Sequence, residues 1–369
     1  MDTSSISDKD RVLGCFLGGA IGDALGYQCE FERGIKEREF TTFADDYGLF
    51  SDDTQMMLFT ANALLWGKTR ATLKGIAPPA VACINYAYRD WYCTQNELPA
   101  PSANVSWIDK VPAMRHRRAP GFTCLNATST TNSAEEYGTL EHPVNQSKGC
   151  GCTMRVAPIG FFARDLKSAV QLAAETAALT HGHPLGIIST AFLGGLMYEI
   201  AHDSTHKFSE QLHIAFEYSN QFATLHFHRQ YQQDFTNIMR KAFELSRNSF
   251  HDQANINELG EGWVAEEAVA IAVYCCLRHQ DDFADAVIAS VNHDGDSDST
   301  GIIAGNIMGA RLGIAAIPPY YLDHIEHRDL IQELATDFAD GVPEGINGLS
   351  DSDPWITKYV KLKPIKEYD

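Results

Sequence analysis

Apolar residues recur at helical spacing along most of the chain. This pattern predicts helices over residues 11–26, 54–66, 80–93, 169–179, 185–200, 268–278, 281–292 and 301–312, with one or two more between 206 and 248. No stretch alternates apolar and polar residues over several strands, as half-buried β-strands would. The sequence therefore predicts an all-α protein, a compact orthogonal helical bundle in a single domain.

The first predicted helix carries a stripe of glycines four residues apart, at Gly14, Gly18, Gly22 and Gly26. Residues at this spacing share one helix face. Each glycine costs about 1 kcal/mol of helix propensity relative to alanine, so close packing against another backbone must compensate. We therefore interpret residues 11–26 as a buried helix packed against the core.

Asp23 interrupts the apolar surface of this helix. A buried carboxylate is costly unless it is paired or hydrogen-bonded. Two interpretations remain open: a core acid that anchors a neighbouring loop, or a direct part of a functional site. The loop that follows, residues 27–48, carries Glu30, Glu32 and Arg33, and such loops often cover sites.

Prolines and polar residues suggest where the domain begins and ends. Residues 1–10 are predicted to be a polar N-terminal tail, and residues 11–350 the domain, with an irregular surface excursion at about 94–147. Residues 351–369 carry prolines and mixed charge. We expect this C-terminal tail to pack last or not at all.

Charge and cysteine content narrow the class of protein. The net charge of −19 argues against a nucleic-acid partner, because phosphate backbones are bound by clustered basic residues. The basic run Arg115-His116-Arg117-Arg118 is interpreted as a solvated loop patch. The odd number of cysteines, nine, without Cys-x-x-Cys spacing indicates reduced thiols. With no signal peptide and no run of eighteen apolar residues, we expect a cytoplasmic protein without a membrane partner; an effector or immunity factor exported without a classical signal would look the same.

Two clusters of oxygen-bearing side chains carry the strongest candidate chemistry. His-Asp-Gly-Asp-Ser-Asp-Ser-Thr-Gly at 293–301 holds three carboxylates and three hydroxyls, and Ser-Asp-Asp-Thr-Gln at 51–55 heads an apolar run. So much like charge requires a cation, and Mg²⁺ or Mn²⁺ prefers such oxygen ligands. Either cluster alone could be an acidic turn that caps a helix. Together they predict one metal site, in which Asp52, Asp53, Asp296 and Asp298 would balance two divalent cations.

A glycine-containing loop offers a candidate anion site. Gly149 and Gly151 free the backbone to turn N–H groups toward an anion, and Lys148 and Arg155 could supply positive charge. A tight turn before a helix is the alternative. His181 and His183 flank Gly182; because no cysteine or acid cluster lies at zinc spacing, capping or substrate contact is favoured for them.

With these segments identified, the chain resembles the ADP-ribosylglycohydrolases. The resemblance rests on segments in family order: Gly-Gly-Ala-Ile-Gly-Asp-Ala-Leu-Gly at 18–26, Ser-Asp-Asp-Thr-Gln at 51–55, Met-Arg-Val-Ala-Pro-Ile-Gly at 154–160, Leu-Thr-His at 179–181, Gly-Trp-Val-Ala-Glu-Glu-Ala at 262–268 and Gly-Asp-Ser-Asp-Ser at 295–299. It implies an all-α fold around a central dinuclear site for two Mg²⁺ or Mn²⁺ ions.

The resemblance also implies roles for individual residues. The implied metal ligands are Ser51, Asp52, Asp53, Asp296, Asp298 and Ser299. The implied catalytic acids are Glu30 of the flap loop, Asp53, Asp296 and Asp298. The implied substrate contacts are Lys148, Gly149, Cys150, Gly151, Met154 and Arg155 near a diphosphate, and His181 near a ribose. Ser51 and Ser299 depart from the family, which commonly has threonine there, but both residues offer a hydroxyl.

The expected activity is metal-dependent hydrolysis of ADP-ribosyl-arginine on a modified protein. A metal-activated water would attack the anomeric carbon through an oxocarbenium-like transition state. Hydrolysis of serine-linked ADP-ribose is one alternative. The other is an immunity or binding protein that neutralises an ADP-ribosyltransferase toxin by direct occlusion.

Overall fold

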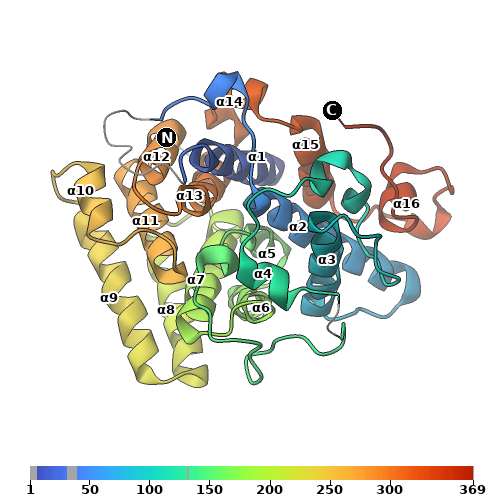
Figure 1. Cartoon of the computed structure of the whole chain (residues 1–369), viewed down its shortest axis with the longest axis horizontal. Helices are drawn as coiled ribbons and strands as arrows, with labels where there is room; N and C mark the ends of the chain where they lie inside the picture. Colours follow the sequence, from blue (N-terminus) through green and yellow to red (C-terminus); the bar gives the residue numbers. More distant parts are fainter. Residues whose placement is uncertain (1–5, 31–39, 131–132, 369) are drawn as a thin grey trace.

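The computed structural model describes residues 6–30, 40–130 and 133–368. Within these ranges the chain is helical, with two isolated β-bridges and no strand, which confirms the all-α prediction (Figure 1). The α-helices are α1 (Asp8–Tyr27), α2 (Asp52–Lys74), α3 (Ala80–Gln95), α4 (Phe122–Ala127), α5 (Ala157–Phe162), α6 (Leu166–Ala178), α7 (Pro184–His202), α8 (Phe208–His226), α9 (Arg229–Leu245), α10 (Asp252–Asn257), α11 (Ala265–Arg278), α12 (Phe283–Val291), α13 (Ser297–Leu312), α14 (Pro319–His324), α15 (Arg328–Asp340) and α16 (Pro354–Tyr359). The short 3₁₀ helices are η3 (Ala44–Asp46), η4 (Ile108–Lys110), η5 (Pro112–Arg115), η6 (Cys150–Cys152), η7 (Ile314–Ala316) and η8 (Ile346–Gly348).

The glycine stripe of α1 faces α13, and the two helices run antiparallel. Gly22 lies against Gly301, and Gly14 lies against Gly309 near the other end of the pair. A Cβ atom on Gly22 would stand 2.0 Å from the carbonyl oxygen of Gly301. The expected close backbone approach is therefore present, and it fixes where α13 begins relative to α1.

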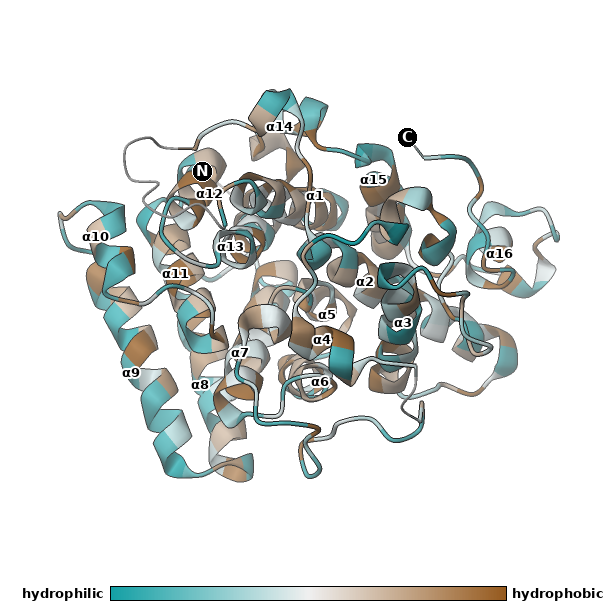
Figure 2. Cartoon of the chain, in the orientation of Figure 1, coloured by the Kyte–Doolittle hydropathy of each residue, from teal (hydrophilic) through white to brown (hydrophobic). Residues whose placement is uncertain are grey.

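Helix α7 forms the centre of the second half of the bundle, where it packs against α5, α6 and α8. It is long and apolar enough to cross a membrane, but 89% of its most apolar window is buried inside the fold, as expected of a core helix. Figure 2 shows apolar residues along these central helices and polar residues along α9 at the edge of the molecule.

The irregular segment after α3 is packed more deeply than a surface excursion. Trp107 and Ile108 are fully buried. Asp90 of α3 anchors the segment, because its Oδ2 atom accepts hydrogen bonds from the backbone N–H groups of Val105, at 2.9 Å, and Ser106, at 3.0 Å. The sequence prediction of irregular structure holds, but the predicted surface position is wrong for these buried residues.

Asp90 predicts a pH dependence of stability. Burial raises the pKa of this carboxyl to about 7, above the value of about 4 for an exposed aspartate. The folded state therefore holds the proton more tightly, and the contribution of this group to stability is lost as pH rises from about 4 to about 7. From pH 5 to pH 8, the free energy of unfolding of the wild type should fall by about 2–3 kcal/mol more than that of Asp90→Asn, which has no carboxyl group to titrate at this position. Urea unfolding at both pH values measures this difference, and parallel losses in the two proteins would refute it.

The C-terminal segment packs onto the bundle, so of the two expectations for it, packing last or not at all, the second is wrong. Trp355 of α16 is buried and donates from Nε1 to Thr69 Oγ1 at 3.0 Å. Lys358 is also buried and forms ion pairs with Glu333 and Asp337 of α15. The apolar anchor and the paired charge together explain why this segment is ordered against α2 and α15.

Candidate active site

Helices α2 and α13 begin beside the C-terminal end of α1, and their first turns meet at one cavity of about 230 Å³. The cavity is lined by Glu30, Asp52, Asp53, Ala119, Gly121, Phe122, Thr123, Cys124, Gly149, Cys150, Gly151, Met154, His181, Trp263, Asp296, Asp298 and Ser299. Both acidic clusters singled out in the sequence contribute to this single site.

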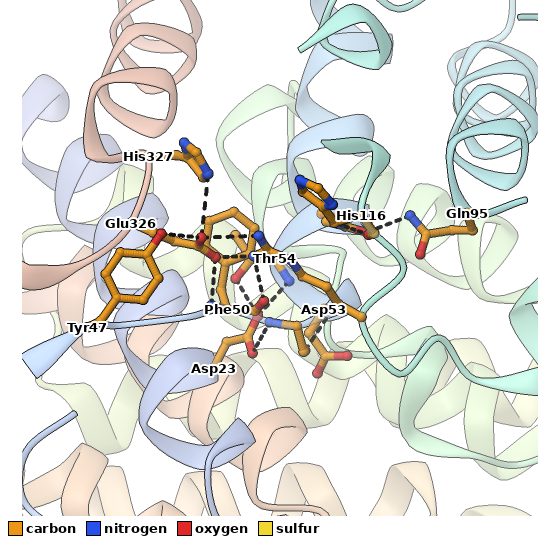
Figure 3. A network of polar contacts seen from close by, with 12 residues as sticks. Asp23, Tyr47, Phe50, Asp53, Thr54, Gln95, His116, Glu326 and His327 are labelled. Carbon is orange, nitrogen blue, oxygen red and sulfur yellow. Dashed lines mark hydrogen bonds and ion pairs between the residues drawn. The ribbon is translucent and has the colours of Figure 1, made fainter. Parts of the chain in front are cut away.

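Asp23 holds the start of α2 in place. Its carboxylate accepts hydrogen bonds from the N–H groups of Ser51 and Thr54, both at 2.9 Å, and from the Thr54 hydroxyl at 2.5 Å (Figure 3). Asp23 is fully buried and does not line the cavity. Burial raises its pKa to about 6, while these hydrogen bonds act to lower it. Of the two interpretations left open by the sequence, the structure supports the anchoring acid.

An ion pair clamps the same segment from the opposite side. Arg118 is buried, pairs with Glu326, and donates to the carbonyl oxygen of Phe50 at 2.9 Å. Glu326 in turn accepts from the Phe50 N–H at 3.0 Å, beside Asp23 in Figure 3. The basic run was predicted to be a solvated patch, and for Arg118 that prediction is wrong. This residue instead fixes the backbone that presents Asp52 and Asp53.

A hydrogen bond from Ser299 to Asp53 joins the two acidic clusters directly. Ser299 donates from its hydroxyl to Asp53 Oδ2 at 2.9 Å, and its N–H donates to Asp298 Oδ1 at 2.9 Å. Carboxylate oxygens of Glu30, Asp296 and Asp298 lie within 4.8 Å of one another. The structure therefore brings Glu30 and both clusters together.

Among the described residues, the cavity gathers acidic side chains without a positive side chain to balance them. Burial raises the pKa values of Asp52, Asp53 and Asp298 well above their ordinary range, and the neighbouring carboxylates add to the rise. The same causes, burial and then Asp296 and Asp23, raise the pKa of Glu30 to about 8. None of the described residues that line the cavity is a lysine or an arginine.

This donor set fits hard divalent cations, which bind carboxylate and hydroxyl oxygens. Bound cations would also lower the pKa values of the carboxyl groups beside them. Ser51 is the one implied ligand that does not line the cavity; its Oγ accepts from the Asp53 N–H at 3.2 Å.

The glycine loop forms one wall of the cavity. Gly149 pairs with Val264 in an antiparallel bridge, and the Cys150 N–H donates to the carbonyl oxygen of Trp263 at 3.2 Å. The Cys150 thiol donates to Asp296 Oδ2 at 2.7 Å, which links the loop to the acidic cluster. Gly151 and Met154 line the same wall.

The two cations proposed for anion binding lie elsewhere. Arg155 is fully buried, with its guanidinium 4.4 Å from the Tyr88 ring centroid and hydrogen-bonded to Thr180. Lys148 is partly exposed and pairs with Glu266. Neither side chain lines the cavity, and the N–H groups of Gly149 and Cys150 already donate to Ser147 Oγ, at 3.3 Å, and to the Trp263 carbonyl oxygen.

His181 lines the cavity as a neutral side chain. Burial, and then the charge of Arg155, lower its pKa to about 3. Its Nδ1 atom lies 2.8 Å from the Thr180 hydroxyl. His183 lies just outside, where it caps α7 by accepting from the Leu185 N–H at 3.2 Å.

Two exposed aromatic residues at the cavity were not singled out from the sequence. Phe122 is 78% exposed and Trp263 is 42% exposed. Trp263 follows Gly262 at the start of a predicted helix, so its place in that segment was a usable signal. Phe122 falls in the irregular segment, where no periodicity points to it. Glu32 and Arg33 lie outside the described residues.

The fold and the site together define the class of protein. It is an all-helical protein with a carboxylate cavity that suits divalent cations. The chain belongs to the ADP-ribosylglycohydrolase family, whose model matches residues 4–346. This family is generally metal-dependent, and its members act as glycosidases on ADP-ribosylated targets.

Relatives and a solved structure agree with this assignment. The chain is 24% identical to the ADP-ribosylarginine hydrolase Tri1 of Pseudomonas putida (strain GB-1), over 91% of this chain and 79% of that protein. It is 25% identical to the ADP-ribosyl-[dinitrogen reductase] glycohydrolase of Rhodospirillum rubrum, over 87% of this chain and 92% of that protein. A solved ADP-ribosylglycohydrolase-related protein complex shares the fold, with a TM-score of 0.61 at 23% identity over 90% of this chain and 98% of that one.

Proposed function

We propose that this glycohydrolase cleaves the N-glycosidic bond of ADP-ribosyl-arginine on a modified protein and so reverses mono-ADP-ribosylation. The observation that carries the proposal is the convergence of Asp52, Asp53, Asp296, Asp298 and Glu30 on one cavity, whose described lining residues include no lysine or arginine. The arginine linkage is supported by the similarity to the Pseudomonas putida relative, which is an ADP-ribosylarginine hydrolase.

The proposed cofactors are two Mg²⁺ or Mn²⁺ ions. The four aspartates would balance their charge, with Ser51 and Ser299 as hydroxyl donors in the same two helix starts. When bound, such ions lower the pKa of a water molecule and hold sugar hydroxyls. The resulting reaction requires a proton for the departing guanidine.

Glu30 is the proposed proton donor. Its carboxyl group lines the cavity beside Asp296 and Asp298, within reach of a guanidine that departs there. The N–H group of Gly151, which lines the cavity, would face the diphosphate. The exposed rings of Phe122 and Trp263 at the same cavity would pack against flat parts of the substrate.

Release of free ADP-ribose from an ADP-ribosyl-arginine peptide tests the proposal. We expect release with Mg²⁺ or Mn²⁺, loss of release with chelator, and much slower release from a serine-linked peptide. Faster release from the serine-linked peptide would reverse the linkage assignment. Failure to release from either peptide, with the protein folded and metal-loaded, would favour the occluding binding protein, and a pull-down of an ADP-ribosyltransferase would then test that reading.

A further inference from the structure

Arg155 lies behind the cavity wall without a carboxylate partner among the described residues. Its side chain is fully buried, and one guanidinium nitrogen lies 3.6 Å from Cys124 Sγ, on a residue that lines the cavity. The other donates to the Thr176 carbonyl oxygen at 3.3 Å and to the Thr180 hydroxyl at 2.5 Å. A guanidinium has only donors and keeps its proton in proteins. The Thr180 oxygen therefore accepts from Arg155.

The direction of this hydrogen bond determines where the proton of Thr180 points. A hydroxyl has a single proton, and His181 Nδ1, at 2.8 Å, is the acceptor that the described residues offer to Thr180 Oγ1. Nδ1 accepts this proton and so carries none of its own. Burial, and then the charge of Arg155, lower the pKa of His181 to about 3, so the ring is neutral at pH 7. A neutral imidazole carries one proton, and only Nε2 is left to hold it.

The Nε2 atom of His181 faces the glycine loop on the cavity wall. A Cβ atom on Gly149 would stand 3.3 Å from Nε2, and one on Gly151 would stand 3.3 Å from Cε1 of the same ring. His181 lines the cavity, and no described residue accepts a hydrogen bond from its Nε2. This atom is also not sealed from solvent. It is a donor that remains available to a ligand in the cavity.

We propose that Arg155 and Thr180 are positioning residues, which hold His181 in the tautomer that carries its proton on Nε2, so that His181 donates to a phosphate oxygen of bound ADP-ribose. The identity of this acceptor rests on the proposed function, whereas the proton relay rests on the contacts of the three side chains. The opposite tautomer would turn a lone pair on Nε2 toward the cavity, and that lone pair would repel a phosphate oxygen. Arg155 thus acts on the substrate through His181 rather than by direct contact.

Two-bond ¹H–¹⁵N correlation spectra of the full chain with ¹⁵N-labelled histidine test the relay without a ligand. The wild type at pH 7 should carry the His181 proton on Nε2, and His181→Gln assigns the signal. Thr180→Ser keeps the hydroxyl and should keep this tautomer. Thr180→Val removes the hydroxyl, and the proton should then be found on Nδ1 in a substantial fraction of molecules.

Thr176→Val is the matched control for Thr180→Val. It makes the same substitution four residues earlier, beside the same guanidinium, which donates to the Thr176 carbonyl oxygen. The Thr176 hydroxyl is buried and has no hydrogen-bond partner. Its removal should leave the tautomer of His181 unchanged.

Calorimetric titration with free ADP-ribose in Mg²⁺ measures the consequence for binding. Thr180→Val should bind ADP-ribose about 10-fold more weakly than the wild type, as expected for the loss of one hydrogen bond to a charged group. Thr180→Ser and Thr176→Val should keep the wild-type affinity. In the hydrolysis assay the loss should appear in KM with kcat nearly unchanged, because the contact is made equally in the ground state and the transition state.

The possible outcomes separate the relay, its acceptor and the hydrolase assignment. A wild-type His181 with its proton on Nδ1 would overturn the relay, and that spectrum does not depend on the stability of any variant. An unchanged tautomer in folded Thr180→Val would overturn it as well. An altered tautomer with wild-type affinity for ADP-ribose would overturn the assignment of the acceptor. If the hydrolase assignment fails instead, no peptide releases ADP-ribose, but the tautomer of His181 still depends on Thr180.

Discussion

Asp298→Asn is expected to lower the rate of ADP-ribose release and the affinity for Mg²⁺ by at least about 100-fold, because even outer-shell partners of metal ligands cost 10–100-fold. Asp298 is 5% exposed and lies among Asp53, Asp296 and Glu30. Asparagine keeps the size of the side chain but removes the charge that a divalent cation requires. Steady-state kinetics and calorimetric metal titration measure the two losses.

The same substitution should leave the fold intact. Burial and neighbouring carboxylates raise the pKa of Asp298, so neutralising it relieves repulsion, and the Tm in chelator should stay equal or rise. Asp294→Asn is the matched control, since Asp294 belongs to the same acidic run but does not line the cavity. Wild-type activity and metal affinity in Asp298→Asn would remove the basis of the metal-site proposal.

The sequence predicted the acidic clusters well because each is local. Asp52 and Asp53 lie at the start of one apolar helix, and Asp296 and Asp298 lie at the start of another. The sequence next to each pair is enough to predict this position at a helix start. Convergence of the two helix starts could also be anticipated, since like charge in that amount needs a shared counterion. The family resemblance added Glu30, which no periodicity identifies.

The fate of the arginines could not be predicted in this way. Arg118 pairs with Glu326, which is 208 residues away in sequence, and Arg155 contacts Thr180, which follows the end of α6 and is 25 residues away. A basic residue in a loop is solvated in most folds, so only tertiary contacts reveal these buried partners. The same holds for Lys358, whose partners on α15 explain the packed C-terminal segment.

Helix existence was easier to predict than helix extent. Helix α2 continues to Lys74, beyond the predicted end at residue 66. The prediction ended too early because the last turns are more polar and only partly buried. Gly75 ends it in a left-handed conformation at φ 69°, a common helix stop. The pattern of apolar residues weakens where the helix is less buried, so this pattern does not mark the end of α2. The capping residue Gly75 marks it instead.

Gly22→Ala is expected to destabilise the protein by at least about 3 kcal/mol, at or beyond the upper end of ordinary overpacking costs. The added Cβ would lie 2.0 Å from the oxygen and 2.5 Å from the carbon of the Gly301 carbonyl. These are backbone atoms of the facing helix, so no side chain can rotate away. Alanine gains about 1 kcal/mol of helix propensity, and an isolated α1 would therefore be stabilised, which makes the sign of the effect diagnostic of the interface. Urea unfolding measures it.

Gly348→Ala provides the control for this prediction, because a Cβ there would have no heavy atom within 4 Å. Its free energy of unfolding should change by less than about 0.5 kcal/mol.

The effect of Gly22→Ala should also reach the active site. The same interface continues to Gly26, which lies against Ser297 and Asp298, so a shift of α13 relative to α1 moves Asp298 relative to Asp53. Folded Gly22→Ala protein should therefore bind Mg²⁺ more weakly than the wild type. Wild-type stability together with wild-type metal affinity would show that the glycine contact does not set the position of the acidic cluster.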